Sequence, residues 1–441
     1  HLFGHTINTQ TAEEAFTVYD HPKVFILQKA DTFDLTAFRK NLDAINLSQI
    51  SNKNPVEYRD MENILSLLLT DEQAAIQQTG GTWSVLFNRS AWINENQIFG
   101  TFVWMLILML IGWIFFPMSR IVFGSLRDKG FGISKFFGIL CIGYVVWICG
   151  FLEIPYTRGL IIIVIAVFAL LNLILFLSDR KKLSAEIHKN IQIFLRSELI
   201  FLSFFLFFLL IRLGNPDLWH PAKGGEKPMD FSYFNAVLKS TIFPPYDPWF
   251  AGGYLNYYYY GFFLSGLLVK LIGMIPSIAY NLILPTWYGF LAIGAYSAGS
   301  AIYSATKPHA ADFKADKWAN ISGMLSIFML QVIGNLGTIK IILSEMVELG
   351  SGGATGSGLQ NITWFFSGLL KLLQGQHFQM YRGDWYWIPS RAIPGEPITE
   401  FPFFTFLYGD PHAHLFALPI TVLVLVWLLA IIRRMQDSSK G

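Results

Sequence analysis

The sequence has few charged residues for its length. Asp, Glu, Lys and Arg make up 14% of its 441 residues, whereas about 25% is typical of soluble domains. Hydrophobic residues make up 53%, and phenylalanine alone occurs 40 times, which excludes a water-soluble globular protein. The formal net charge is only +2, and no basic patch is interleaved with aromatic residues, so we expect no nucleic-acid partner. The composition predicts an integral membrane protein.

Cysteine is scarce as well. Cys141 and Cys149 are the only two, and they lie eight residues apart in one apolar run. On a helix they would be about 12 Å apart, which is too far for a disulfide, so both are expected to be core residues. The chain starts at His1 without a Met or a signal peptide and ends in a polar tail, so we expect a fragment of a longer polypeptide.

Eight apolar runs follow a mixed segment, residues 1–98. This segment has no run of about 20 apolar residues, the length needed to cross a bilayer, so we interpret it as a small water-facing segment. Asp20 and His21 within it are more typical of a turn than of a catalytic site. The apolar runs cover 99–118, 134–152, 159–178, 196–214, 256–275, 280–305, 318–343 and 411–432.

Basic residues predict which runs cross the membrane. The loops after the first and third runs carry clusters of Lys and Arg, which places both in the cytoplasm. If all eight runs crossed, Arg433 and Arg434 would lie outside. Omitting the run 256–275, which Lys270 interrupts and Pro276 ends, removes this conflict. We therefore predict a juxtamembrane helix for 256–275 in the outer interface, and seven spans.

The predicted fold is an all-α polytopic protein of the cytoplasmic (inner) membrane, with its polar loops on the outer face. About seven transmembrane helices are joined by outer-face juxtamembrane helices. The parts are a water-facing segment (1–98), four transmembrane helices (99–214), a first outer loop with juxtamembrane helices (215–279), two transmembrane helices (280–343), a second outer loop (344–410), and the last transmembrane helix with a cytoplasmic tail (411–441).

The first outer loop contains acidic candidates for catalysis. Asp230 follows Pro228 at the start of a helical pattern. It could cap that helix, which is a common role for Asp, or accept a proton from an incoming hydroxyl as a general base. Glu226 is a second catalytic candidate in the same loop.

The second outer loop ends in the sequence GDPHAH, which contains Asp410, His412 and His414. On a helix the two histidines would point about 200° apart, whereas in an extended segment all three residues would share a face. One Asp and two His residues form a plausible set of metal ligands, with Asp410 also a catalytic candidate. The alternative is a group of interfacial polar residues that bind loop backbone.

Other residues of the two loops could bind substrate. Tyr257 and Tyr258 begin a run of four tyrosines that could line a sugar or lipid groove, although an interfacial aromatic belt is the more common role. Basic side chains could bind phosphate or could simply be exposed interface charges. These phosphate-binding candidates are His220, Lys223, Lys227, Arg382 and Arg391.

Two blocks carry a resemblance to a known family. They are NPDLWHPAKGGEKPMDFSYFNAVLKSTIFPPYDPWFAGGYLNYYYYG and TEFPFFTFLYGDPHAHLFALP. They resemble the YYY-domain family of uncharacterised polytopic membrane proteins, over about residues 100–432. The second block of that family usually reads Asp-Leu-His-Pro-His, and Pro411 and Ala413 depart from it. The family name supplies no reaction.

The order of spans and loops is also similar, more weakly, to type C (GT-C) membrane glycosyltransferases. That resemblance implies a polyprenyl-phosphate sugar as donor, inverting transfer to an acceptor on the outer face, and Asp230 as the acidic catalytic residue. Arg382 or Arg391, with a divalent metal at Asp410, His412 and His414, would stabilise the leaving phosphate. We expect Asp230 and Asp410 to lie within about 10–12 Å of each other, so that both could reach one sugar phosphate.

Two other classes of function stay open at this point. One is a non-catalytic scaffold that binds other subunits of a membrane assembly. The other is a lipid or solute transporter, which should have ionisable residues within its spans or two related halves. The sequence shows no carboxylate in the middle of a span and no related halves. Membrane lipids are expected partners under all three interpretations.

Overall fold

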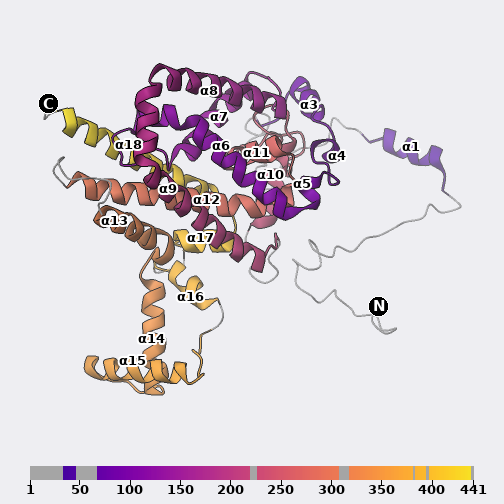
Figure 1. Ribbon diagram of the computed structural model, residues 1–441. Coiled ribbons are helices and arrows are strands. Elements are labelled where there is room, and N and C mark those ends of the chain that lie inside the picture. Colours follow the sequence, from indigo (N-terminus) through magenta and orange to yellow (C-terminus); the bar gives the residue numbers. More distant parts are fainter. Residues whose placement is uncertain are drawn as a thin grey trace.

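A computed structural model of the chain describes residues 33–45, 67–218, 226–306, 317–380, 383–393 and 397–438. These residues form helices and, apart from two isolated bridges, no β-structure (Figure 1). The predicted all-α fold is confirmed. Asp20 and His21 lie outside the described residues. Both cysteines are free, as predicted.

Six helices are long and apolar enough to cross a membrane, and a bent pair of helices could form a seventh span. The pair is α13 (Lys317–Ile327), continued by the π-helical turn η3 (Phe328–Ile333), and α14 (Gly337–Ser351), with a bend of 69°. The predicted number of about seven is confirmed. The six helices are α6 (Gln97–Phe123), α7 (Ser134–Phe151), α8 (Arg158–Ser178), α9 (Arg180–Gly214), α12 (Pro276–Ala305) and α18 (Ala413–Ser438).

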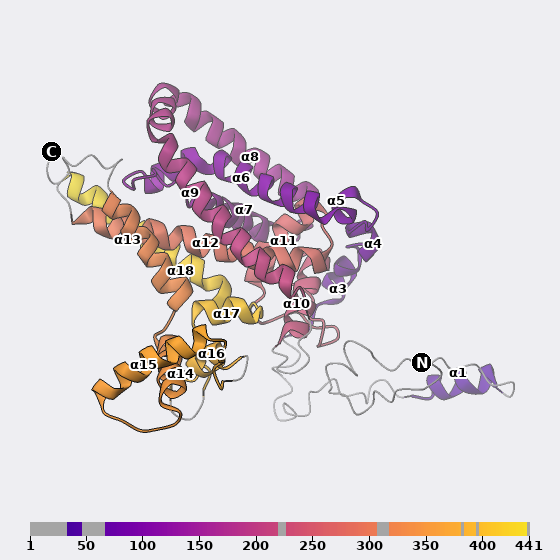
Figure 2. The same ribbon diagram turned by 60° about the horizontal axis from the view of Figure 1, so that its bottom comes forward.

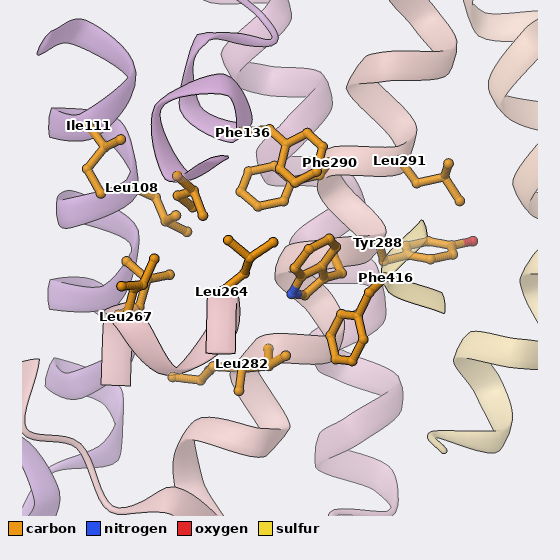
Figure 3. Close-up of a cluster of buried hydrophobic side chains, with 14 of the residues drawn as sticks. Leu108, Ile111, Phe136, Leu264, Leu267, Leu282, Tyr288, Phe290, Leu291 and Phe416 are labelled. Atoms are coloured by element: carbon orange, nitrogen blue, oxygen red, sulfur yellow. The ribbon is translucent and has the colours of Figure 1, made fainter. Parts of the chain in front are cut away.

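Helix α12 lies at the centre of the bundle. The protein buries 89% of its apolar stretch but only 17% of that of α8. Three glycines let neighbouring helices come close: a Cβ at Gly289, Gly294 or Gly299 would contact α9, α18 or α13 at under 3.0 Å. Figure 3 shows part of the surrounding core, in which Phe290 lies near Phe136 of α7.

The loops gather at two opposite ends of the bundle. At one end, which we call the basic end, Arg434 donates to the carbonyl of Ile121 and Arg120 pairs with Asp179. At the other, the site end, Asn94 donates to the carbonyl of Gly273 and the first and second loops meet. The two predicted outer loops therefore share one end, opposite the basic clusters that predict the cytoplasmic side.

Helix α11 (Tyr260–Ile272) is packed inside the protein rather than exposed on its surface. With 13 residues it is about 20 Å long, too short to cross, which agrees with omitting it as a span. The predicted surface position is wrong, because ten of its 13 residues are buried and it packs on α7, α8, α10, α12 and α18. Lys270 is satisfied inside the protein, where Nζ donates to the carbonyl oxygen of Tyr156 at 2.5 Å and lies 3.7 Å from the centre of its ring.

The segment before the first span is partly built into the bundle. Gln77 is buried, donates to the carbonyl of Ile242 at 3.0 Å and accepts from the backbone of Thr241 at 2.7 Å. Residues 67–96 therefore pack on the site end rather than forming a separate water-facing unit. Besides α1 (Leu35–Asp43), the helices before α6 are α3 (Asp71–Gln78), α4 (Trp83–Leu86) and α5 (Trp92–Glu95).

The second loop is mostly helical. Helices α14 and α15 (Gly358–Leu373) form a hairpin that stands away from the bundle (Figure 2). The hairpin is held by two glycines, Gly350 and Gly368, where any side chain would meet the opposite backbone. The loop returns to the site end through α16 (Asp384–Trp387), the short η4 (Ile388–Ser390) and α17 (Pro402–Tyr408).

Candidate functional site

The candidate site lies where the two loops meet at the site end. The first loop contributes α10 (Lys227–Lys239) and the tyrosines before α11. The second contributes residues 409–412, the non-helical lead-in to α18. A hydrogen bond of 2.8 Å from the backbone N–H of Glu226 to Asp410 Oδ2 joins the two loops. Residues 184 positions apart in the sequence thus form one site.

Two aspartates and a histidine converge there. His412 Nε2 lies 3.4 Å from Asp410 Oδ2 and 3.8 Å from Asp230 Oδ2. One ligand atom from each of the three residues lies within 4.8 Å of the others. The predicted proximity of Asp230 and Asp410 is confirmed, at a shorter distance than expected. We call Asp230, Asp410 and His412, with Glu226 beside them, the acid cluster.

The acid cluster contains buried polar atoms that the protein leaves unsatisfied. The exposed fraction is 0% for Asp230 and 6% for Asp410. Among the described residues, neither oxygen of Asp230, nor Asp410 Oδ1, nor His412 Nε2 has a hydrogen-bond partner. Glu226 Oε2 is 3.0 Å from His412 Nε2, but this contact lacks hydrogen-bond geometry. Leaving such groups unpaired costs about 1–3 kcal/mol each, which points to a bound group or to a shared proton.

The charge state of Asp230 follows from its surroundings. The pKa of its carboxyl is raised to about 11, mainly by burial and also by the neighbouring carboxyl of Asp410 and the charge of Glu226. Without a nearby cation, Asp230 is therefore protonated at neutral pH. The capping interpretation fails, because Glu226 occupies the N-cap position and the Asp230 oxygens accept no backbone hydrogen bond of α10.

Two buried cations lie beside the acid cluster. Lys227 and Arg212 are each only 4% exposed. Both come close to Gly409, where a Cβ would sit 3.1 Å from Arg212 Nη1 and 3.6 Å from Lys227 Cε. Burial lowers the pKa of Lys227, as does the charge of Arg212, whereas Asp217 and Asp410 oppose this shift. Gly409 has φ +71°, so the absence of a side chain permits both its backbone turn and this close approach.

Arg212 was not predicted as a site residue. It lies within the last turn of α9, where its Nε donates to Asn281 Oδ1 at 2.9 Å and Nη2 to the carbonyl of Asp217 at 3.1 Å. A lone arginine at the end of an apolar run is the signal that could have identified it, because a buried charge in a membrane protein is costly and is generally functional.

His414 does not join the acid cluster. Its Nε2 lies 2.8 Å from Glu400 Oε2. Helix α18 begins at Ala413, so His414 is already helical and points elsewhere, whereas Asp410 and His412 are in the lead-in. The predicted ligand set Asp410, His412 and His414 is therefore corrected: Asp230 takes the place of His414.

The tyrosine run brings Tyr258 beside the acid cluster. The ring of Tyr258 lies 5.7 Å from that of His412 and 4.0 Å from that of Tyr257. Among the described groups the Tyr258 hydroxyl has no hydrogen-bond partner, and burial, with the charge of Asp230, raises its pKa far above the usual range. Tyr257 in turn contacts Tyr233 of α10, with ring centres 6.1 Å apart.

The remaining basic candidates divide into two groups. Arg391 lies just after η4, with its guanidinium 4.5 Å from the centre of the Trp387 ring. His220, Lys223 and Arg382 lie outside the described residues. Of the predicted phosphate-binding side chains in the described chain, Lys227 is therefore the one beside the acid cluster.

A cavity of about 790 Å³ lies on a different side of α10. Phe231 and Asn235 line it from α10, and Trp83 and Arg89 line it from the segment before α6. No member of the acid cluster lines it. The acid cluster and this cavity thus lie on different faces of α10.

Comparison with known proteins identifies the family. The sequence profile described as "Uncharacterized membrane protein (DUF2298)" matches residues 141–441. The chain belongs to this family. The predicted membership of the YYY-domain family is confirmed, and the DUF2298 match includes the whole acid cluster. No curated protein and no solved structure matches the chain.

Proposed function

We propose that this DUF2298 protein transfers a sugar from a polyprenyl-phosphate donor to an acceptor on the outer face of the cytoplasmic membrane. The observation that supports it is the acid cluster, which places two buried carboxyls beside two buried cations at one end of the bundle. A lipid-linked sugar phosphate presents both a leaving phosphate and a reacting carbon at that depth. The weak resemblance to GT-C glycosyltransferases is consistent with the same chemistry.

The proposed reaction is a single displacement with inversion. The acceptor hydroxyl oxygen attacks the anomeric carbon while the bond from that carbon to the phosphate oxygen breaks, and its electron pair leaves with the phosphate. The hydroxyl proton passes to Asp230. Asp230 can accept this proton only in its ionised form, which a cation bound beside it would maintain at neutral pH.

Lys227 and Arg212 are proposed to bind the lipid phosphate. Both are buried beside Gly409, on the Asp410 side of the acid cluster. Arginine binds two phosphate oxygens at once and lysine adds a point charge. Because the charge that develops on the leaving phosphate is larger in the transition state, cations already in place accelerate the reaction. Tyr257 and Tyr258 would line the sugar.

A divalent metal fits the acid cluster. Asp230, Asp410 and His412 would hold it, and their unsatisfied atoms are carboxylate oxygens and one imidazole nitrogen, a mixed donor set that suits a divalent transition metal such as Mn²⁺. A bound cation supplies positive charge that stabilises a leaving phosphate. In its presence Asp230 would also stay ionised at neutral pH, which the proposed proton transfer requires.

The scaffold and transporter alternatives differ from the proposed enzyme in what they predict when proton acceptance by Asp230 is removed. A scaffold needs no unsatisfied carboxyls, since these reduce stability without contributing to assembly. A transporter should place its ionisable groups along a path through the bundle, whereas the acid cluster lies at one end. Both alternatives predict normal behaviour of the protein when proton acceptance alone is removed.

Asp230→Asn tests the proposal. Because Asp230 is protonated in the empty site, the amide replaces a neutral group of equal size, and the thermal midpoint should change little. Transfer of labelled sugar from a polyprenyl-phosphate donor to membrane acceptors should fall by about 10²–10⁴. Asp71→Asn, an exposed residue of α3 at the same end, is the matched control. Unchanged transfer in Asp230→Asn would refute the general base, and no transfer by the wild type would favour the scaffold.

A further inference from the structure

A second hollow with a polar rim lies at the basic end, far from the acid cluster. It is a groove of about 650 Å³ between α9 and α13. Its polar lining is Arg196 of α9 with Lys317 and Asn320 of α13, and its remaining lining is apolar. The groove is therefore positively charged at one end and apolar along the rest.

The arginine of this groove is bound only by neutral groups. Arg196 Nη1 donates to Asn320 Oδ1 at 2.7 Å, and the same oxygen accepts from Arg127 Nη1 at 3.0 Å and from the Tyr296 hydroxyl at 2.7 Å. One neutral amide oxygen thus accepts hydrogen bonds from two guanidinium groups. Within the described part of the chain, no carboxylate forms an ion pair with Arg196.

Other cations at the same end form ion pairs with carboxylates. Arg120 forms ion pairs with both Asp179 and Glu186. Lys135 binds Glu198 at 2.6 Å. The neutral surroundings of Arg196 are therefore a local feature, and its charge remains available to an anion.

The apolar lining follows one helical face. Ile321, Met324 and Leu325 have exposed fractions of 40%, 46% and 54%, and the spacing of three and four residues aligns them along α13. They begin one turn after Lys317. An acyl chain lying along them would start at the basic rim and continue toward the middle of the bundle.

We propose that this groove binds an anionic phospholipid, with its phosphate between Arg196 and Lys317 and one acyl chain along Ile321, Met324 and Leu325. Basic pockets between membrane helices recognise anionic headgroups. The chemistry that Arg196 and Lys317 recognise is a phosphate. The apolar face favours a lipid over a free phosphate ion, which would leave that face unused. The site is independent of the proposed sugar transfer.

Native mass spectrometry of the purified protein in detergent tests this inference with phosphatidylglycerol and phosphatidylcholine of equal chain length. We expect phosphatidylglycerol to be retained several-fold more than phosphatidylcholine by the wild type. Lys317→Gln should remove most of this preference without affecting folding, since Lys317 is exposed. Arg196→Lys keeps the charge but loses the forked geometry, so it should weaken retention less.

Two controls separate the possible explanations. Lys181→Gln removes an exposed charge from α9, at the same end but outside the groove lining, and should retain phosphatidylglycerol normally. Ile321→Trp fills the apolar face without changing charge and should reduce retention. Equal retention of the two lipids, or equal losses in Lys317→Gln and Lys181→Gln, would overturn the proposal. So would complete displacement of the lipid by millimolar inorganic phosphate, which would indicate a free-phosphate site.

Discussion

The two ends of the bundle bury ionisable groups in different ways. At the basic end, Lys135 is 1% exposed and its ammonium meets Glu198 at 2.6 Å. At the site end, Asp230 and Asp410 face each other and His412, and both oxygens of Asp230 and Oδ1 of Asp410 lack hydrogen-bond partners among the described residues. A directly paired opposite charge offsets much of the desolvation cost in the first case, whereas in the second no cation of the described residues forms an ion pair with Asp230 other than His412 at 3.8 Å.

This difference separates structural charges from candidate functional ones. In the pair Lys135–Glu198 the two opposite charges compensate each other and join α7 to α9, although Glu198 Oε2 has no hydrogen-bond partner among the described residues. A buried group without a partner persists at a cost in stability, and such groups concentrate at binding and catalytic sites. Substitutions at the two ends should therefore have opposite effects on stability and on binding.

The largest expected change in stability comes from breaking the pair at the basic end. Glu198→Gln leaves Lys135 buried without a counter-charge, which typically costs about 3–5 kcal/mol. The thermal midpoint in detergent should fall steeply, while Asp230→Asn should barely move it. Replacing both partners by apolar residues, Lys135→Met with Glu198→Leu, should recover most of the loss. An unchanged midpoint in Glu198→Gln would show that the pair is not structural.

The next effect in size is stabilisation of the site end by a cation. Mn²⁺ at about 100 times its dissociation constant should stabilise the wild type by about 2.7 kcal/mol. Asp410→Asn removes a proposed ligand and should abolish the shift, which a melting curve with and without chelator measures. Asp71→Asn should behave like the wild type. An equal shift in Asp410→Asn would place the cation elsewhere.

The pH dependence of stability should be smaller when it is expressed per pH unit. The folded-state pKa of Asp230, about 11, lies above the usual value, so the folded protein keeps a proton that the unfolded chain releases. Its contribution is complete below about pH 4 and is lost as the pH rises toward 11. Between about pH 6 and 9 the cation-free wild type should lose stability relative to Asp230→Asn, by at most about 1.4 kcal/mol per pH unit. Parallel melting profiles would contradict the raised pKa.

The smallest change in stability is expected for Tyr258→Phe. The Tyr258 hydroxyl has no hydrogen-bond partner among the described groups, so its removal should change the free energy of unfolding by less than about 0.5 kcal/mol. If the hydroxyl contacts the sugar, the Michaelis constant for the donor should rise several-fold with little change in turnover. Tyr233→Phe provides a comparison at a ring farther from His412. A loss of several kcal/mol would show that Tyr258 is structural.

Much of the fold could be predicted because membrane spans depend on simple physics. The length of the apolar runs predicted the spans, and the positions of the basic clusters predicted that both polar loops lie at one end. The exception was α11, where Lys270 indicated an interrupted, interfacial helix. Sequence alone does not show that the Tyr156 carbonyl is available to bind that ammonium, so the burial of α11 could not be anticipated.

The candidate site could be predicted in part. Asp230, Asp410 and His412 stand out as polar residues next to apolar runs, and their convergence followed from placing both loops at one end. The exclusion of His414 depends on where α18 begins: the helix starts at Ala413, so His414 is helical whereas Asp410 and His412 are not. Arg212 was not predicted, because the apolar character of the run indicates a span but does not show what a charge at its end would bind.

The burial of α12 has a consequence for how the protein is made. It is the least apolar of the six spans, and Gly294 is covered by Val422 of α18, a helix synthesised more than a hundred residues later. During synthesis α12 therefore enters the membrane before one of its covering helices exists. A chain stopped before α18 would expose this face to lipid, so we expect such chains to be recognised by membrane quality-control proteases and degraded faster than the full-length protein.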